Sequence, residues 1–68
     1  MIVVLNGERR ELRDQARVRD AVAAAGAPEE GRGVAVALDG EVVPRGRWDE
    51  VALEDGQRVE VVRAVQGG

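Results

Sequence analysis

The sequence predicts an α+β fold in which one helix lies across a mixed β-sheet. Two dipeptides typical of tight hairpins, Asn6-Gly7 and Asp39-Gly40, each separate two short segments of strand character. Both positions of such a dipeptide tolerate positive φ, which a two-residue turn between antiparallel strands requires. Residues 18–25 form the clearest helical pattern and lie between these turns. We therefore expect a hairpin, a helix, a second hairpin and a final strand.

The first hairpin joins an apolar strand to a polar one. Met1–Leu5 is a continuous apolar run rich in β-branched residues, and it is too short for a helix. We expect it to form a largely buried strand. Glu8–Leu12 returns as a polar strand at the edge of the sheet, where its charges discourage association with other sheet edges.

The expected helix has apolar residues at the spacing i, i+3, i+4 and i+7. This stripe consists of Val18, Ala21, Val22 and Ala25. Gly26 follows where helices often end with positive φ, and Pro28 opposes continuation. Arg17 occupies the N-cap position although its side chain is a poor cap. Asp14 is the carboxylate that we expect near the first turn.

The second half of the chain completes the sheet. Val34–Leu38 is a second apolar strand, and Glu41–Val43 returns after the Asp39-Gly40 turn. Residues 45–50 read as an irregular turn or a single helical turn, and Arg58–Val65 is the last strand. This order is that of the β-grasp fold, with the first and last strands central and parallel. We expect one domain over residues 1–65 and a flexible tail over residues 66–68.

Alternation of apolar and polar residues indicates which side chains form the core. On the last strand it turns Val59 and Val61 inward and leaves Arg58 and Glu60 outside. The expected core consists of Val3, Leu5, Val18, Val22, Val36, Leu38, Leu53, Val59 and Val61. Trp48 is the only aromatic residue, and we favour a packing role for it over a role in binding.

Composition excludes several classes of function. The 68 residues contain no cysteine and no histidine, so thiolate chemistry and the commonest general base and metal ligand are missing. The net charge of -3 argues against a nucleic-acid partner. No apolar run approaches membrane-spanning length and no signal-peptide pattern is present, so we expect a cytoplasmic protein. We also expect no metal site and no bound cofactor.

The chain ends in Gly67-Gly68. Glycine has no Cβ, so such an arm can reach through a narrow passage into the active site of another enzyme. The alternative is an ordinary frayed terminus without a function.

Several segments together resemble the ThiS-type sulfur carrier proteins of thiamine biosynthesis, which are ubiquitin-like β-grasp proteins. The resemblance covers the whole chain. It rests on Asn6-Gly7, on residues 40–45 (GEVVPR) with Trp48 close behind, on the LEDG turn at 53–56 before the last strand, and on Gly67-Gly68.

The resemblance implies a carrier that is itself a protein substrate and not an enzyme. In such carriers a partner enzyme uses ATP to adenylate the terminal carboxylate, here that of Gly68. Sulfur that originates from a cysteine desulfurase then converts it to a thiocarboxylate, which donates its sulfur to thiazole synthase. Two alternatives remain open at this stage: the small subunit of molybdopterin synthase, and a β-grasp interaction module with an inert tail.

We also expect a docking surface for partner proteins. If Val3 and Leu5 face the helix, Ile2 and Val4 face the opposite side. We expect the apolar residues of this face to form one patch that leads to the tail, because exposed apolar patches often mark partner surfaces. The patch consists of Ile2, Val4, Val62, Ala64 and Val65. Arg45 and Arg47 either meet an acidic partner surface or belong to a solvated turn.

Overall fold

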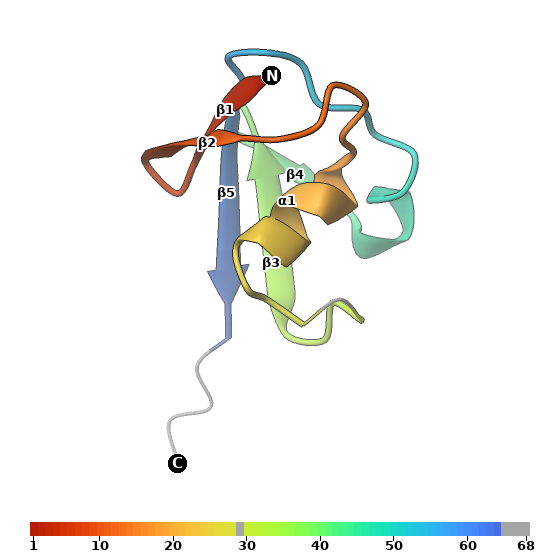
Figure 1. Ribbon diagram of the computed structural model, residues 1–68. Helices are drawn as coiled ribbons and strands as arrows, with labels where there is room; N and C mark the ends of the chain where they lie inside the picture. Colours follow the sequence, from red (N-terminus) through yellow and green to blue (C-terminus); the bar gives the residue numbers. More distant parts are fainter. Residues whose placement is uncertain (29, 65–68) are drawn as a thin grey trace.

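The computed structural model describes residues 1–28 and 30–64 of the chain, and Figure 1 shows its architecture. It contains a mixed sheet, one α-helix and one short 3-10 helix. The elements in chain order are β1 (Ile2–Leu5), β2 (Glu8–Glu11), α1 (Val18–Ala24), β3 (Val34–Leu38), β4 (Glu41–Val43), η1 (Arg45–Arg47) and β5 (Arg58–Arg63).

The sheet has five strands in the order β2-β1-β5-β3-β4. β1 and β5 are parallel and central, whereas the β1–β2, β3–β4 and β3–β5 pairs are antiparallel. Helix α1 lies across one face of the sheet, and the other face has no helix on it (Figure 1). This arrangement confirms the predicted β-grasp fold. The last strand ends at Arg63, two residues earlier than expected, and Val65 lies outside the described residues.

Both predicted hairpin turns are present. Asn6 and Gly7 have φ angles of 49° and 84°, and Asp39 and Gly40 have φ angles of 48° and 88°. Asn6 also pairs with the backbone of β5 beyond the end of β1. Its Oδ1 accepts the N–H of Val61 at 2.8 Å, and its Nδ2 donates to the carbonyl of the same residue at 3.2 Å. The side chain thus replaces a missing strand partner.

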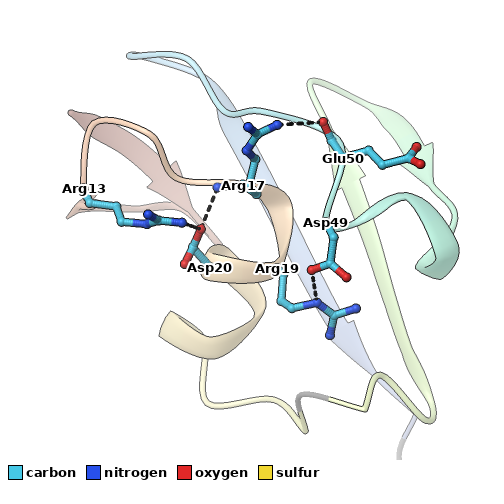
Figure 2. Close-up of polar contacts among 6 residues, drawn as sticks. All are labelled: Arg13, Arg17, Arg19, Asp20, Asp49 and Glu50. Carbon is cyan, nitrogen blue, oxygen red and sulfur yellow. Dashed lines mark hydrogen bonds and ion pairs between the residues drawn. The ribbon is translucent and has the colours of Figure 1, made fainter.

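The N-terminus of α1 is stabilised by Asp20, not by the predicted Asp14. The Asp20 carboxylate accepts the backbone N–H of Arg17 at 2.7 Å and a guanidinium N–H of Arg13 at 3.1 Å (Figure 2). Burial raises the pKa of the Asp20 carboxyl, but these two hydrogen bonds and the nearby charges outweigh it, so the pKa lies below its ordinary value of 3.8. Asp14 instead lies 3.1 Å from the amino group of Met1.

The segment that follows β4 is tied to the helix by polar contacts and by Trp48. Arg19 pairs with Asp49, and a guanidinium N–H of Arg17 donates to the Glu50 carbonyl at 3.0 Å (Figure 2). The Trp48 ring is completely buried, and its Nε1–H donates to the Val43 carbonyl at 3.0 Å. The Arg19 guanidinium lies 5.6 Å from the ring centroid. Packing, as predicted, is therefore the role of Trp48 within this fold.

The core lies between α1 and the sheet and contains the predicted residues with one exception. Leu38 is only half-buried, because it is the last residue of β3 and borders the Asp39-Gly40 turn at the rim of the sheet. Two buried alanines were not predicted, Ala16 before the helix and Ala27 after it. Neither belongs to a periodic segment, so the sequence carries no signal for them.

Candidate functional site

The terminal Gly67-Gly68 lies outside the described residues, so the candidate site is the part of the sheet that leads to it. β5 is held on both sides, by β1 and by β3. Its pairing with the β3 side continues one residue past the strand, where the Ala64 N–H donates to the Gly33 carbonyl at 2.6 Å. β5 ends at the end of the sheet opposite Met1 (Figure 1). The described part of the chain therefore ends directly after a central strand.

The sheet face without a helix carries exposed apolar side chains next to this exit. Val62 is 61% exposed and pairs with Ala35 on β3. Val42 on β4 is 75% exposed and pairs with Ala37. Since Ala35 and Ala37 are two residues apart on one strand, all four side chains share this face and are neighbours. We call these four residues the apolar strip.

The predicted patch is wrong in one respect, because Ile2 and Val4 do not adjoin Val62 and Ala64. Ile2 and Val4 do lie on the face without a helix, but both are half-buried and sit at the far end of β5. Val4 pairs with Arg58, which is four residues before Val62 and thus about 13 Å away along the strand. Arg58 and Glu60 separate the two groups. Alternation identifies the face of a side chain, but the register sets its position along the sheet.

A shallow hollow lies beside the strip at the end of β5. Its volume is about 590 Å³. The lining residues are Gly31, Gly33, Val34, Ala35, Arg45, Val62 and Ala64. The sequence pointed to Val62 and Ala64 here, but not to the loop glycines, because only the folded structure brings residues 31–35 beside β5. Its single charged lining residue is Arg45.

Gly31 shapes one wall of this hollow. It has a φ angle of +77°, and a Cβ built on it would lie 2.5 Å from Cδ of Arg45 and 2.7 Å from the Trp48 ring. The Arg45 stem and the indole therefore pack directly on the glycine backbone. Any larger residue at position 31 would displace at least one of them.

The described residues contain neither a cluster of metal ligands nor a buried polar side chain. Within 1–28 and 30–64 there is no group of three or more acidic, cysteine or histidine residues placed to hold a metal ion. None of the charged or polar side chains in these ranges is buried. No helix in the described part of the chain is long and apolar enough to cross a membrane. What the site does offer is an apolar surface beside a central strand.

These features define a β-grasp protein whose central strand leads to a Gly-Gly terminus. The sequence pattern of the ThiS family matches residues 3–68. The chain therefore belongs to the ThiS family and is a ThiS-type sulfur carrier.

Two solved structures of a thiamine biosynthesis protein from Geobacter metallireducens have the same fold. The crystal structure of that protein, described as ThiS, has a TM-score of 0.79 at 27% identity, with full coverage of both chains. The NMR solution structure has a TM-score of 0.80 at 27% identity and covers all of this chain and 88% of the other. Among curated proteins none matches this chain.

Proposed function

We propose that this protein carries sulfur for thiazole formation in thiamine biosynthesis, as a thiocarboxylate on Gly68. The observation that carries the proposal is the match to the ThiS family over residues 3–68, which includes both terminal glycines. The central position of β5 supports it, because a strand with neighbours on both sides gives the tail a rigid base. The same match favours thiamine biosynthesis over the molybdopterin alternative.

The proposed chemistry needs a partner enzyme because a carboxylate is a poor electrophile. Its negative charge repels nucleophiles, and it has no good leaving group. In the first step an oxygen of the Gly68 carboxylate attacks the α-phosphorus of ATP and releases pyrophosphate. The outer sulfur of a persulfide formed by a cysteine desulfurase then attacks the carbonyl carbon of this mixed anhydride, and AMP leaves. A second thiol reduces the resulting acyl disulfide, which releases the Gly68 thiocarboxylate and leaves a disulfide on the sulfur donor. Glycine presents the least crowded carbonyl for this attack.

The carrier itself contributes the terminus and a surface, and it binds neither ATP nor a cofactor in this proposal. The adenylating enzyme supplies the ATP site, and thiazole synthase accepts the sulfur. The proposal includes a cytoplasmic location for the protein and its partner enzymes. The absence of histidine and cysteine from the sequence supports a passive role, since such a chain has no thiol to form its own thioester.

Removal of Gly68 tests the role of the terminus. We expect the truncated protein to lose adenylation, measured as exchange of labelled pyrophosphate into ATP in the presence of the adenylating enzyme. Its thermal unfolding should match the full chain, because the described core lies entirely within residues 3–61. Retained adenylation in the truncated protein would show that Gly68 is not the reacting residue.

The apolar strip is proposed as the surface on which the partner enzymes dock. It adjoins the end of β5, so a partner seated on it is close to the chain that leads to the terminus. Val62→Asp should weaken binding to both the adenylating enzyme and thiazole synthase while the domain stays folded, because Val62 is mostly exposed. Ala23→Asp, at an exposed position on the helix, is the control for added charge. Equal affinity of the Val62 and Ala23 variants would exclude the strip.

A further inference from the structure

Arg45 differs from Arg47, its neighbour on the same 3-10 helix, in having no acidic partner among the described residues. Within residues 1–28 and 30–64, its guanidinium makes no hydrogen bond or ion pair. Arg47 lies two residues away on the same 3-10 helix, and its Nε is 3.1 Å from a carboxylate oxygen of Glu50. The two arginines that the sequence treated alike are thus distinguished by the fold: one is paired on the surface and one is not.

The position of Arg45 is fixed by Gly31. The side-chain stem passes so close to the glycine that a Cβ there would lie 2.5 Å from Cδ. The neighbouring Trp48 ring is fully buried and also packs against Gly31. An arginine stem held on a rigid surface loses less conformational freedom on binding than a free one. Arg45 is therefore preorganised at the wall of the hollow.

The hollow places this unpaired charge beside the proposed docking strip. Val62 and Ala64 line it from β5, and Ala35 lines it from β3. Two further arginines flank the lining residues in sequence, Arg32 between two lining glycines and Arg63 between Val62 and Ala64.

Charge is unevenly distributed between the two ends of the sheet. Four acidic residues gather where β5 begins: Asp39, Glu41, Glu54 and Asp55. At the end of the sheet where the hollow lies, the chain carries Arg32, Arg45 and Arg63. Glu30 is the acidic residue described in the loop whose glycines line the hollow. In a chain with a net charge of -3, the end of the sheet at the hollow therefore holds more arginines than the end where β5 begins, which has Arg58.

We propose that Arg45 forms the ionic anchor for a carboxylate of the enzyme that adenylates the tail. The occupant of the hollow is a segment of that enzyme with an Asp or Glu side chain flanked by apolar residues. The apolar residues lie against Val62 and Ala35, and the carboxylate pairs with the Arg45 guanidinium. A guanidinium presents two parallel N–H donors that match the two oxygens of a carboxylate. This inference rests on the proposed carrier function.

The test compares three variants in the pyrophosphate-exchange assay with the adenylating enzyme. Arg45→Glu reverses the charge at the hollow, Arg45→Lys keeps it, and Arg47→Glu makes the same reversal on the neighbouring arginine. We expect Arg45→Glu to raise the KM for the carrier about tenfold or more, because like charges then face each other across the interface. Arg45→Lys should have a KM between those of the wild type and Arg45→Glu, because lysine keeps the charge but lacks the paired N–H donors. Arg47→Glu should stay within about threefold of the wild type. The kcat should change little in all three variants.

The dependence on salt provides a second readout that a structural role for Arg45 would not change. The KM of the wild type should rise steeply between low and high ionic strength, and that of Arg45→Ala should rise less. Equal KM values for Arg45→Glu and Arg47→Glu, with the wild type active, would overturn the ionic anchor and leave the carrier function standing. A wild type that is not adenylated would overturn both.

Discussion

Gly31→Ala is the substitution whose cost can be estimated most directly from the geometry. Gly31 is buried and has a φ angle of +77°. The added methyl would lie 2.7 and 2.9 Å from two carbons of the Trp48 ring and 2.5 Å from Cδ of Arg45. The Arg45 stem lies at the surface, so the added methyl would displace it from its packed position on Gly31. The ring is completely buried and hydrogen-bonded to Val43, so it cannot move without disturbing the core.

The expected cost has two parts. Placing alanine in the left-handed region costs about 1 kcal/mol. Forcing a methyl group against a packed core costs about 1–3 kcal/mol more. We therefore expect Gly31→Ala to lower the free energy of unfolding by about 2–4 kcal/mol, a large share for so small a domain. Gly26→Ala is the matched control, because Gly26 has a φ angle of +76° and nothing lies within 4 Å of its built Cβ.

Equilibrium unfolding in urea, followed by far-UV circular dichroism, measures both costs. Circular dichroism is preferable to the fluorescence of Trp48, because the Gly31 substitution perturbs that ring directly. We expect Gly26→Ala to show the backbone cost alone and Gly31→Ala to exceed it clearly. Equal destabilisation by the two substitutions would mean that the ring does not pack against Gly31 as described.

Two further predictions concern stability. Leu5→Ala should lower the free energy of unfolding by about 2–5 kcal/mol, since Leu5 is buried; a urea-measured cost below about 1 kcal/mol would contradict its placement in the core. Asp20→Asn should destabilise the protein at neutral pH, because the lowered pKa of Asp20 favours the folded state above 3.8. This advantage of the wild type is lost as the pH falls through the lowered pKa, so unfolding curves at successive pH values should converge; a constant difference would refute the role of the charge.

Local sequence patterns predicted most of the fold because each element carries its own signal. The hairpins follow from Asn6-Gly7 and Asp39-Gly40, whose positive φ angles are present in the structure. The helix follows from its apolar stripe and from Gly26. Once the elements are ordered, the parallel pairing of the first and last strands follows from the need for a long crossover.

The features that the sequence did not predict depend on contacts between distant residues. The pairing of the Asn6 side chain with Val61 requires the parallel strand to stand beside the hairpin. Leu38 faces the same side of the sheet as the buried Val36, but it lies too close to the rim of the sheet to be fully covered. The expected patch was wrong for a similar reason. Alternation along the strands places Val4 and Val62 on the same face of the sheet, but the strand register keeps them apart.

The hollow and the unpaired Arg45 also depend on the tertiary fold. The sequence gives no reason to separate Arg45 from Arg47. The pairing of Arg47 with Glu50 and the contact of Arg45 with Gly31 make that distinction. The terminal glycines were recognisable in the sequence and lie outside the described residues.

The intact mass of the protein tests the central claim most directly. The purified chain is incubated with the adenylating enzyme, ATP, a sulfur source of cysteine and cysteine desulfurase, and a thiol reductant, and then measured by mass spectrometry. We predict a mass increase equal to the difference between one sulfur and one oxygen atom, present only with ATP and absent when Gly68 is removed. An unchanged mass, under conditions in which the same enzymes convert another ThiS protein, would contradict the proposal that Gly68 carries sulfur.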